Sequence, residues 1–403
     1  MTDFLPYGKQ QVLDTDIDAV VEVLRSPFLT TGPAVSDFEK AFQAVTGSAE
    51  AVVCANGTAA LHLASMCLDL QAGDAVIVPS VTFVATANAP HMCGAEVVFA
   101  DVDSDTGLIT PEHLGKALKR AVKQRLRVRA VLPVHLNGQI VDVAALRAHP
   151  ALAPHVEIIE DASHAVGARQ SDGHPVGSCV QSAFATFSFH PVKTITCGEG
   201  GMVTCASPDK AEALRRFRNH GLVHDPDSFT ATGQAFEEDS HAQPNPWYYE
   251  MPAPGLNYRA TDIACALGHA QLKRLPEIIT QRTLLVERYR EQLSNAHPAI
   301  NWLRAAAGTP AWHLAVALID FERAGTSRAA LMKTLRERNI GTQVHYLPVH
   351  RQPYYRRRNP GLELRGADEY YRRCLSLPLF AQMTTGDVDR VVASLLEALT
   401  KAS

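Results

Sequence analysis

The sequence predicts an α/β protein, with a parallel or mostly parallel sheet in a large first domain and a smaller α+β domain after it. Two observations support this prediction. From about residue 50, short apolar runs alternate with helical patterns, and each run ends in a turn or a polar cluster. After about residue 256, a long helical stretch is followed by mixed strand and helix patterns. We therefore expect a large domain over residues 1–255 and a smaller one over residues 256–403.

The apolar runs of the first domain supply its expected strands. They are short and rich in Val, Ile and Phe, as strands are when both faces of a parallel sheet are covered by crossover helices. The first run continues through a turn into a helical pattern, "AVVCANGTAALHLASMCL". The runs lie within residues 51–68, 75–83, 95–103, 129–138 and 155–165.

The rest of the chain changes character at residues 222–255, where Pro, Asp, Ser, Gln and Gly accumulate. This composition predicts a long loop or excursion. Residues 272–293 then predict an amphipathic helix, because apolar residues recur on one face. A strand over 313–321, a helix over 328–338 and a terminal helix over 387–401 complete the expected smaller domain.

Composition and charge restrict the classes of function. Apolar residues make up 46% of the chain and charged residues 20%, which predicts a soluble globular protein. The formal net charge of -4 gives no general attraction to nucleic acid or to anionic lipid, so we expect neither partner. The N-terminus lacks the basic and apolar segments of a signal peptide, which favours a cytoplasmic protein. Eight cysteines are dispersed without a CxxC pair, which suits reduced thiols rather than disulfides or a metal site.

A turn that can bind phosphate is the first candidate site. In "CANGTAALHLA", Asn56, Gly57 and Thr58 form a turn into a helix. Free N–H groups and the positive end of a helix suit a phosphate, and the Thr58 hydroxyl would add a donor. The alternative is an ordinary helix cap with a turn glycine.

A carboxylate at a strand end is the second candidate. In "HVEIIEDASHAVGA", an apolar strand ends at Glu160 and Asp161, and His164 follows. Ligands of α/β sheets gather at the carboxyl ends of the strands. A magnesium ligand of a P-loop enzyme is excluded, because the chain has no G-x-x-x-x-G-K-[ST] loop. Two interpretations remain: Asp161 caps the next helix, or it pairs with a protonated ring nitrogen, as the acidic partner of pyridoxal phosphate does.

Lys193 is the third candidate and helps to decide between these interpretations. It follows the strand-like "FATFSFHPV" and precedes a turn with three glycines, and Ser188 lies five residues before it. A partly desolvated lysine is a good nucleophile for carbonyl chemistry, because burial disfavours the ammonium. The alternative is a surface lysine in a hairpin turn. The phosphate-type turn, the strand-end acid and the lysine occur in an order that suits one pyridoxal-phosphate site.

The chain resembles the DegT-type sugar-nucleotide aminotransferases, which are fold type I pyridoxal-phosphate enzymes. The resemblance covers nearly the whole chain and is weaker between residues 222 and 245. It depends on "NGTAAL", "EDASHAVGA", "FSFHPVKTITCGEGGMV", "RNHG" and "GLNYRATDIACALGHAQL". Within the family, "PWYYEM" before "NYR", together with "TQVHYLPVH", is most similar to the C4 aminotransferases of pseudaminic-acid biosynthesis.

The resemblance implies a role for each matching residue. Lys193 would be the Schiff-base lysine and Asp161 the partner of the pyridine nitrogen. The cofactor would also contact Gly57, Thr58, Phe83, His164 and Ser188, and Asn257 from the neighbouring subunit of a homodimer with shared active sites. The substrate would contact Tyr7, Thr30, Thr31, Gly32, Arg259, His345 and Tyr346. Cys197 stands where many relatives have threonine, and this change keeps a small side chain.

The implied reaction is a transamination with L-glutamate as the amino donor. The acceptor would be a UDP-linked 4-keto-6-deoxy-N-acetylhexosamine, aminated at C4, with 2-oxoglutarate as the second product. Three alternatives stay open: a sugar aminotransferase acting at C3 or on a GDP- or TDP-linked ketosugar, the dehydratase branch of the family, and a pyridoxal-phosphate-binding regulator without turnover. Lys193 argues against the dehydratases, which have histidine at this position. The chain also lacks an appended helix-turn-helix segment, which argues against a regulator.

Overall fold

In the described part of the chain, the larger of two sheets contains seven strands in the order β1-β7-β6-β5-β4-β2-β3. The computed structural model describes residues 3–236 and 243–400. Strands β2 to β6 are mutually parallel, whereas β7 is antiparallel to both of its neighbours, β6 and β1. The predicted mostly parallel sheet is therefore confirmed. Its strands are β1 (Glu50–Cys54), β2 (Asp74–Pro79), β3 (Glu96–Ala100), β4 (Arg127–Val131), β5 (Glu157–Asp161), β6 (Phe184–Ser188) and β7 (Gly201–Cys205).

Helices cover both faces of this sheet. Side chains alternate along β1, so Ala51 and Val53 pack in one core with Phe38 of α2, while Val52 packs in the other core with Leu63 of α3. The two helices before β1 did not figure in the sequence prediction. The helices up to β8 are α1 (Asp14–Arg25), α2 (Pro33–Thr46), α3 (Gly57–Met66), α4 (Val84–Met92), α5 (Pro111–Lys123), α6 (Val143–Arg147), α7 (Pro208–Arg218), α8 (Thr232–Ala235), α9 (Asp262–Leu272) and α10 (Leu275–Leu293).

A small antiparallel sheet with strand order β10-β9-β8 forms the centre of the C-terminal part. Helix α10 leads to it: Leu275 packs in the core beside α2 and α9, whereas Leu285 and Tyr289 pack in the core of the small sheet. Because α9 packs on α1 and α2, residues on both sides of position 256 share one core. The domain boundary near residue 256 stays a prediction. The remaining elements are β8 (Ile300–Trp302), β9 (Ala315–Ile319), β10 (Cys374–Leu377), α11 (Arg328–Glu337), α12 (Pro353–Arg358), α13 (Arg365–Arg373) and α14 (Thr385–Thr400).

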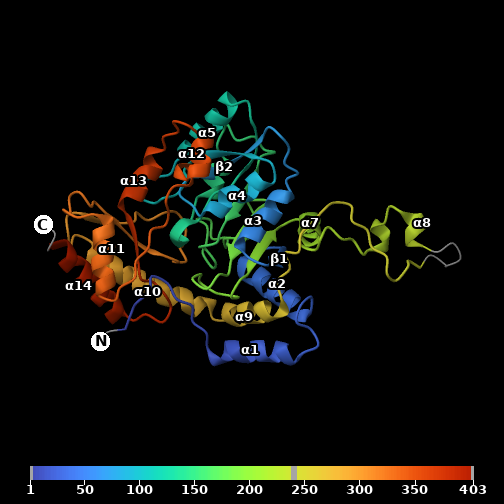
Figure 1. Cartoon of the computed structure of the whole chain (residues 1–403), viewed down its shortest axis with the longest axis horizontal. Coiled ribbons are helices and arrows are strands. Elements are labelled where there is room, and N and C mark those ends of the chain that lie inside the picture. Colours follow the sequence, from blue (N-terminus) through green and yellow to red (C-terminus); the bar gives the residue numbers. More distant parts are fainter. Residues whose placement is uncertain (1–2, 237–242, 401–403) are drawn as a thin grey trace.

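Residues 222–236 and 243–256 belong to an arm that projects from the body, and α8 lies in its outer part (Figure 1). Its base is held at Gly221, where an added Cβ would lie 1.8 Å from the Ala253 carbonyl oxygen. The arm exposes large apolar side chains: Trp247 is 70% exposed and Met251 59%. This arm agrees with the excursion that the composition predicts.

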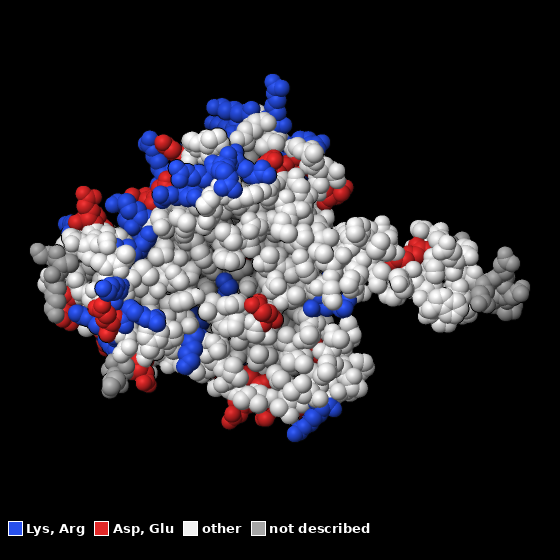
Figure 2. Space-filling model, viewed as in Figure 1, with Lys and Arg blue, Asp and Glu red and all other residues white. Residues whose placement is uncertain are grey.

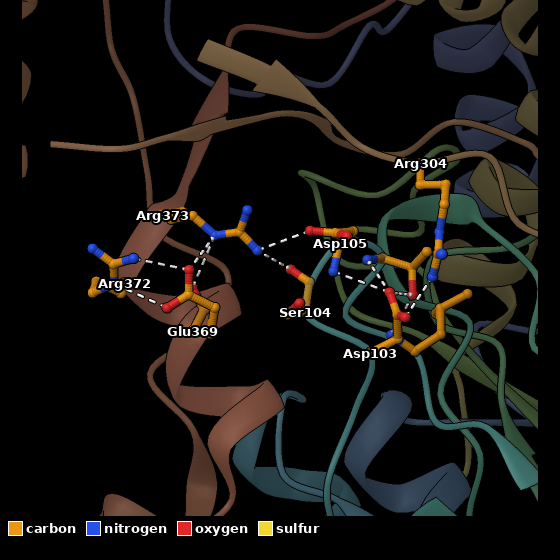
Figure 3. A network of polar contacts seen from close by, with 9 residues as sticks. Asp103, Ser104, Asp105, Arg304, Glu369, Arg372 and Arg373 are labelled. Carbon is orange, nitrogen blue, oxygen red and sulfur yellow. Dashed lines mark hydrogen bonds and ion pairs between the residues drawn. The ribbon is translucent and has the colours of Figure 1, made fainter. Parts of the chain in front are cut away.

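Polar contacts join the C-terminal part to the loop after β3 (Figure 3). The Arg373 guanidinium pairs with Asp105 at 2.9 Å and donates to the Ser104 carbonyl at 2.8 Å, and Arg304 pairs with Asp103. Ion pairs that stay partly open to solvent, as these do, contribute about 0–1 kcal/mol each. They join the loop after β3 to the C-terminal part, which contributes His313, His345 and Tyr346 to the cleft described below.

Three further findings concern the described residues. No helix over residues 3–236 and 243–400 is long and apolar enough to cross a membrane. No group of three or more His, Cys, Asp or Glu side chains in these ranges could hold a metal ion. The eight cysteines are free thiols.

Candidate active site

A cleft of about 900 Å³ opens at the carboxyl ends of β5 and β6, beside the starts of α3 and α4. This is the edge at which α/β sheets bind ligands. Lys193 is the one lysine or arginine that lines the cleft within the described part of the chain. Figure 2 shows a hollow near the centre of this face with a basic group inside it.

Most of the site residues expected from the sequence line this cleft. They come from distant parts of the chain. Tyr7 precedes α1 and His345 follows α11, yet their ring centroids lie 5.5 Å apart. The structure brings together Tyr7, Gly57, Thr58, Phe83, Asp161, His164, Ser188, Lys193, His345 and Tyr346.

The start of α3 forms an anion cradle. The Asn56 side chain accepts the Ala59 N–H at 2.8 Å, so Asn56 is the helix cap. The N–H groups of Gly57 and Thr58 have no hydrogen-bond partner among the described residues, and both residues line the cleft. An added Cβ at Gly57 would lie 2.7 Å from Ser188 Cβ, so only glycine lets β6 approach this closely. Free N–H groups at a helix start beside a serine suit a phosphate.

The Asp161 carboxylate is held in one orientation. It ends β5 and is 4% exposed. Its Oδ2 accepts the Thr86 hydroxyl at 2.7 Å, and its Oδ1 accepts the Ser163 N–H at 3.2 Å. Among the described residues, neither oxygen forms an ion pair. A fixed, buried carboxylate at this place suits a partner that brings a proton, such as the ring nitrogen of pyridoxal phosphate.

Lys193 provides the nucleophile of the cleft. Burial lowers the pKa of its amine from 10.5 to about 8, and the negative charge of Asp161 opposes part of the shift. The amine makes no hydrogen bond or ion pair within the described residues. At a pKa of about 8, roughly one amine in ten is unprotonated at pH 7, far more than at the ordinary value of 10.5, and this free amine can react with a carbonyl group.

An exposed ring and neutral histidines complete the walls. Phe83 is 56% exposed although it is large and apolar, so a flat cofactor would cover it. Burial, the Lys193 charge and His345 hold the pKa of His164 well below its usual range. Burial and the Lys193 charge lower the pKa of His345 to about 3. These side chains therefore act as neutral groups at physiological pH.

Sequence reasoning missed several residues of this site. Thr86 binds Asp161 and lies three residues after Phe83, a helical spacing that could have indicated it. His313 lines the cleft, and its ring lies 4.4 Å from that of His164. Tyr258 also lines the cleft. Tyr258 lies between Asn257 and Arg259 in the "NYR" motif, which could have indicated it, whereas His313 has no local signal because a distant segment brings it here.

The remaining predicted residues lie outside the cleft, at the start of α9. Thr30 pairs with Thr261, and the Gly32 N–H donates to Asp262 at 2.8 Å. The Arg259 guanidinium donates to the side-chain oxygen of Asn219, and the backbone of Asn219 pairs with that of Asn257. Within one chain these residues do not reach the cleft, and their roles stay predictions. They are Thr30, Thr31, Gly32, Asn257 and Arg259.

Comparison with known proteins identifies the family. Residues 10–396 match the model of the DegT/DnrJ/EryC1/StrS aminotransferase family. Helicobacter pylori PseC, an aminotransferase involved in the biosynthesis of pseudoaminic acid, is 25% identical over 99% of this chain and 100% of its own, with a TM-score of 0.84. The putative sugar aminotransferase Spr1654 from Streptococcus pneumoniae, in its PLP form, is 25% identical over 99% of this chain and 100% of its own, with a TM-score of 0.83. DesI, solved in the presence of its TDP-sugar product, is 28% identical over 100% of this chain and 94% of its own, with a TM-score of 0.83.

The cofactor follows from the family and agrees with the cleft. Spr1654 has been solved in both PLP and PMP forms. The anion cradle at α3, the fixed Asp161 carboxylate, the exposed Phe83 ring and the Lys193 amine fit pyridoxal 5'-phosphate. The mostly parallel sheet with its small antiparallel partner is the architecture of fold type I enzymes. The chain belongs to the DegT/DnrJ/EryC1/StrS aminotransferase family and is a PLP-dependent aminotransferase.

Proposed function

We propose that this enzyme transfers the amino group of L-glutamate to C4 of a UDP-linked 4-keto-6-deoxy-N-acetylhexosamine. The products would be UDP-4-amino-4,6-dideoxy-N-acetyl-β-L-altrosamine and 2-oxoglutarate, in the biosynthesis of pseudaminic acid. The observation that carries the proposal is the Lys193 amine, which faces a cleft of about 900 Å³ with a lowered pKa. The similarity to PseC over the whole of both chains supports the choice of sugar.

The central residues of the cleft have distinct tasks in this proposal. When bound, pyridoxal phosphate supplies an aldehyde carbon that accepts amino groups and a ring that withdraws electrons. The Lys193 Nζ takes the proton from the α-carbon of the amino donor. Asp161 keeps a proton on the ring nitrogen, since Thr86 and Ser163 fix its oxygens. The N–H groups of Gly57 and Thr58 bind the phosphate.

A panel of sugar nucleotides tests the substrate. We expect amination of UDP-2-acetamido-2,6-dideoxy-β-L-arabino-hexos-4-ulose, with products identified by mass spectrometry and NMR. A site that pairs polar groups with the substrate rejects an epimer that leaves them unpaired, by up to roughly 10⁴-fold. The D-xylo epimer should therefore react far more slowly. Equal rates on both epimers would contradict the proposed substrate.

A second candidate is amination of a TDP- or GDP-linked ketosugar, at C3 or C4. The similarity to DesI, which was solved with its TDP-sugar product, favours it. The same panel distinguishes the two candidates, because it includes 3-keto and 4-keto sugars on each nucleotide. Preference for a TDP- or GDP-ketosugar would support the second candidate.

We further propose a cytoplasmic homodimer with shared active sites. Asn257, Thr30 and Thr31 are exposed in one chain and lie outside its own cleft, so they are available to a neighbour. Eight free thiols suit a reducing compartment. In a two-fold dimer, Lys193→Ala mixed with Asn257→Ala should regain about one intact site per heterodimer. Absence of activity despite proven subunit exchange would contradict the shared site.

A further inference from the structure

The tautomer of His164 is fixed by the backbone. The N–H of Asn137 donates to His164 Nδ1 at 3.3 Å. A backbone N–H cannot accept a hydrogen bond, so Nδ1 must carry a lone pair. The proton of the neutral ring is therefore on Nε2, which lies 3.2 Å from the Tyr346 hydroxyl oxygen. His164 donates, and the Tyr346 oxygen accepts.

In a second histidine–tyrosine pair the hydrogen bond has the opposite direction, with tyrosine as the donor and histidine as the acceptor. His91 Nδ1 lies 2.9 Å from the Ala95 carbonyl oxygen, to which it must donate. Its Nε2 therefore has the lone pair and accepts from the Tyr354 hydroxyl at 2.6 Å. Tyr354 uses its proton within the pair, whereas Tyr346 keeps its proton for another acceptor.

Asn137 is held firmly enough to set this direction. It is fully buried and adopts a left-handed φ of 64°, which asparagine tolerates better than most residues. Its side-chain nitrogen donates to the Tyr370 hydroxyl at 3.1 Å, and its carbonyl accepts the His313 N–H at 3.0 Å. The donor that fixes His164 therefore cannot turn away easily.

No described residue accepts the Tyr346 hydroxyl proton, and Tyr346 lines the cleft. We propose that Tyr346 donates a hydrogen bond to an oxygen of the bound ligand, and that Asn137 and His164 act as positioning residues that hold the hydroxyl in this direction. The oxygen belongs to the ring hydroxyl of the cofactor or to the keto group of the substrate, since both accept hydrogen bonds. The inference rests on the proposed function in that it requires a bound cofactor and a keto substrate.

The charges around His164 preserve this arrangement near neutral pH. His164 faces Lys193, His345 and His313, and the Lys193 charge and burial both disfavour a second proton on its ring. A doubly protonated ring would lose the bond from Asn137 N–H. The two hydrogen bonds, from Asn137 N–H to His164 and from His164 to Tyr346, therefore keep their direction while His164 stays neutral.

Four variants of the holoenzyme test the inference: Tyr346→Phe, His164→Asn, His164→Gln and the double variant of Tyr346→Phe with His164→Asn. Asparagine can accept the Asn137 N–H but does not reach Tyr346, whereas glutamine can place a donor where Nε2 lies. Tyr354→Phe is the matched control, because it removes a tyrosine–histidine bond outside the cleft. Two readouts are measured: the pH titration of the visible absorbance of the holoenzyme without substrate, and kcat and KM for each half-reaction.

We expect Tyr346→Phe and His164→Asn each to lower kcat by about 100-fold, as loss of one oriented donor does. The double variant should be no worse than either single variant, and His164→Gln should recover most of the rate. A shifted titration midpoint in both single variants assigns the oxygen to the cofactor. An unshifted midpoint with loss confined to the ketosugar half-reaction assigns it to the substrate. Either result supports the inference.

The inference is overturned if Tyr346→Phe equals the wild type in both readouts. It is also overturned if the losses multiply in the double variant, or if His164→Gln is as slow as His164→Asn, since His164 would then act independently of Tyr346. Failure of the proposed function looks different: the wild-type enzyme would turn over none of the expected sugar. The titration needs no sugar and separates the two failures.

Discussion

Replacing Lys193 by methionine should stabilise the cofactor-free protein at neutral pH. Burial lowers the pKa of this amine from 10.5 to about 8, so the folded chain holds the ammonium less favourably than the unfolded chain does. One pKa unit corresponds to about 1.4 kcal/mol, and the whole shift to roughly 3 kcal/mol. Methionine keeps an apolar stem without the charge. We expect the free energy of unfolding to rise by roughly 1–3 kcal/mol at pH 7.

The pH dependence of this effect has a definite sign. Between pH 8 and 10.5 the unfolded chain binds more protons at Lys193 than the folded chain does, so the wild type gains stability as the pH rises through this window. The Lys193→Met variant lacks this group. Its advantage should be complete below pH 8 and should shrink as the pH approaches 10.5.

Urea denaturation at neutral pH, below this window, and at its upper end near pH 10.5 measures the effect. Wild type and Lys193→Met are compared at neutral pH and again near the upper end, and Lys333→Met serves as control because Lys333 is exposed in the middle of α11. The control should change little. The reasoning is refuted if Lys193→Met is less stable than the wild type at neutral pH, or if its advantage is the same at both ends.

Two further substitutions test the cofactor site. Gly57→Ala should lower stability by about 1–3 kcal/mol through overpacking and weaken cofactor binding, because the added Cβ would lie 2.7 Å from Ser188 Cβ; thermal unfolding and cofactor titration measure this, and Gly386→Ala, whose nearest neighbour atom lies at 3.6 Å, should be tolerated. Thr86→Val should weaken cofactor binding by about tenfold, because Asp161 Oδ2 loses its 2.7 Å donor. Thr86→Ser keeps the hydroxyl and should bind the cofactor nearly normally. Equal affinities for the Val and Ser variants would contradict the role of this bond.

The parts of the site that the sequence predicted correctly are those with local signals. Gly57 and Thr58 follow a strand and begin a helix, and Asp161 ends a strand, so each is positioned at the sheet edge by its own short segment. Lys193 stands out because an aromatic strand and a glycine turn flank it. Elements of this kind can be found without knowing which strands are neighbours.

The parts that the sequence did not predict depend on tertiary contacts. The bond between Asn137 and His164 and that between His164 and Tyr346 join segments far apart in the chain, and no periodicity encodes them. Strand β7, which follows the glycine turn after Lys193, did not figure in the sequence prediction. Its antiparallel direction is likewise a property of the assembled sheet.

The attachment of the cofactor to Lys193 is the central claim, and reduction with borohydride tests it directly. The reduced holoenzyme is digested, and the peptides are analysed by mass spectrometry. We predict a pyridoxyl group on Lys193, because its amine lies in the cleft with a pKa lowered to about 8. Lys193→Ala should give no adduct. A pyridoxyl group on Lys273, which is exposed and lies outside the cleft, or on any other lysine would contradict the account.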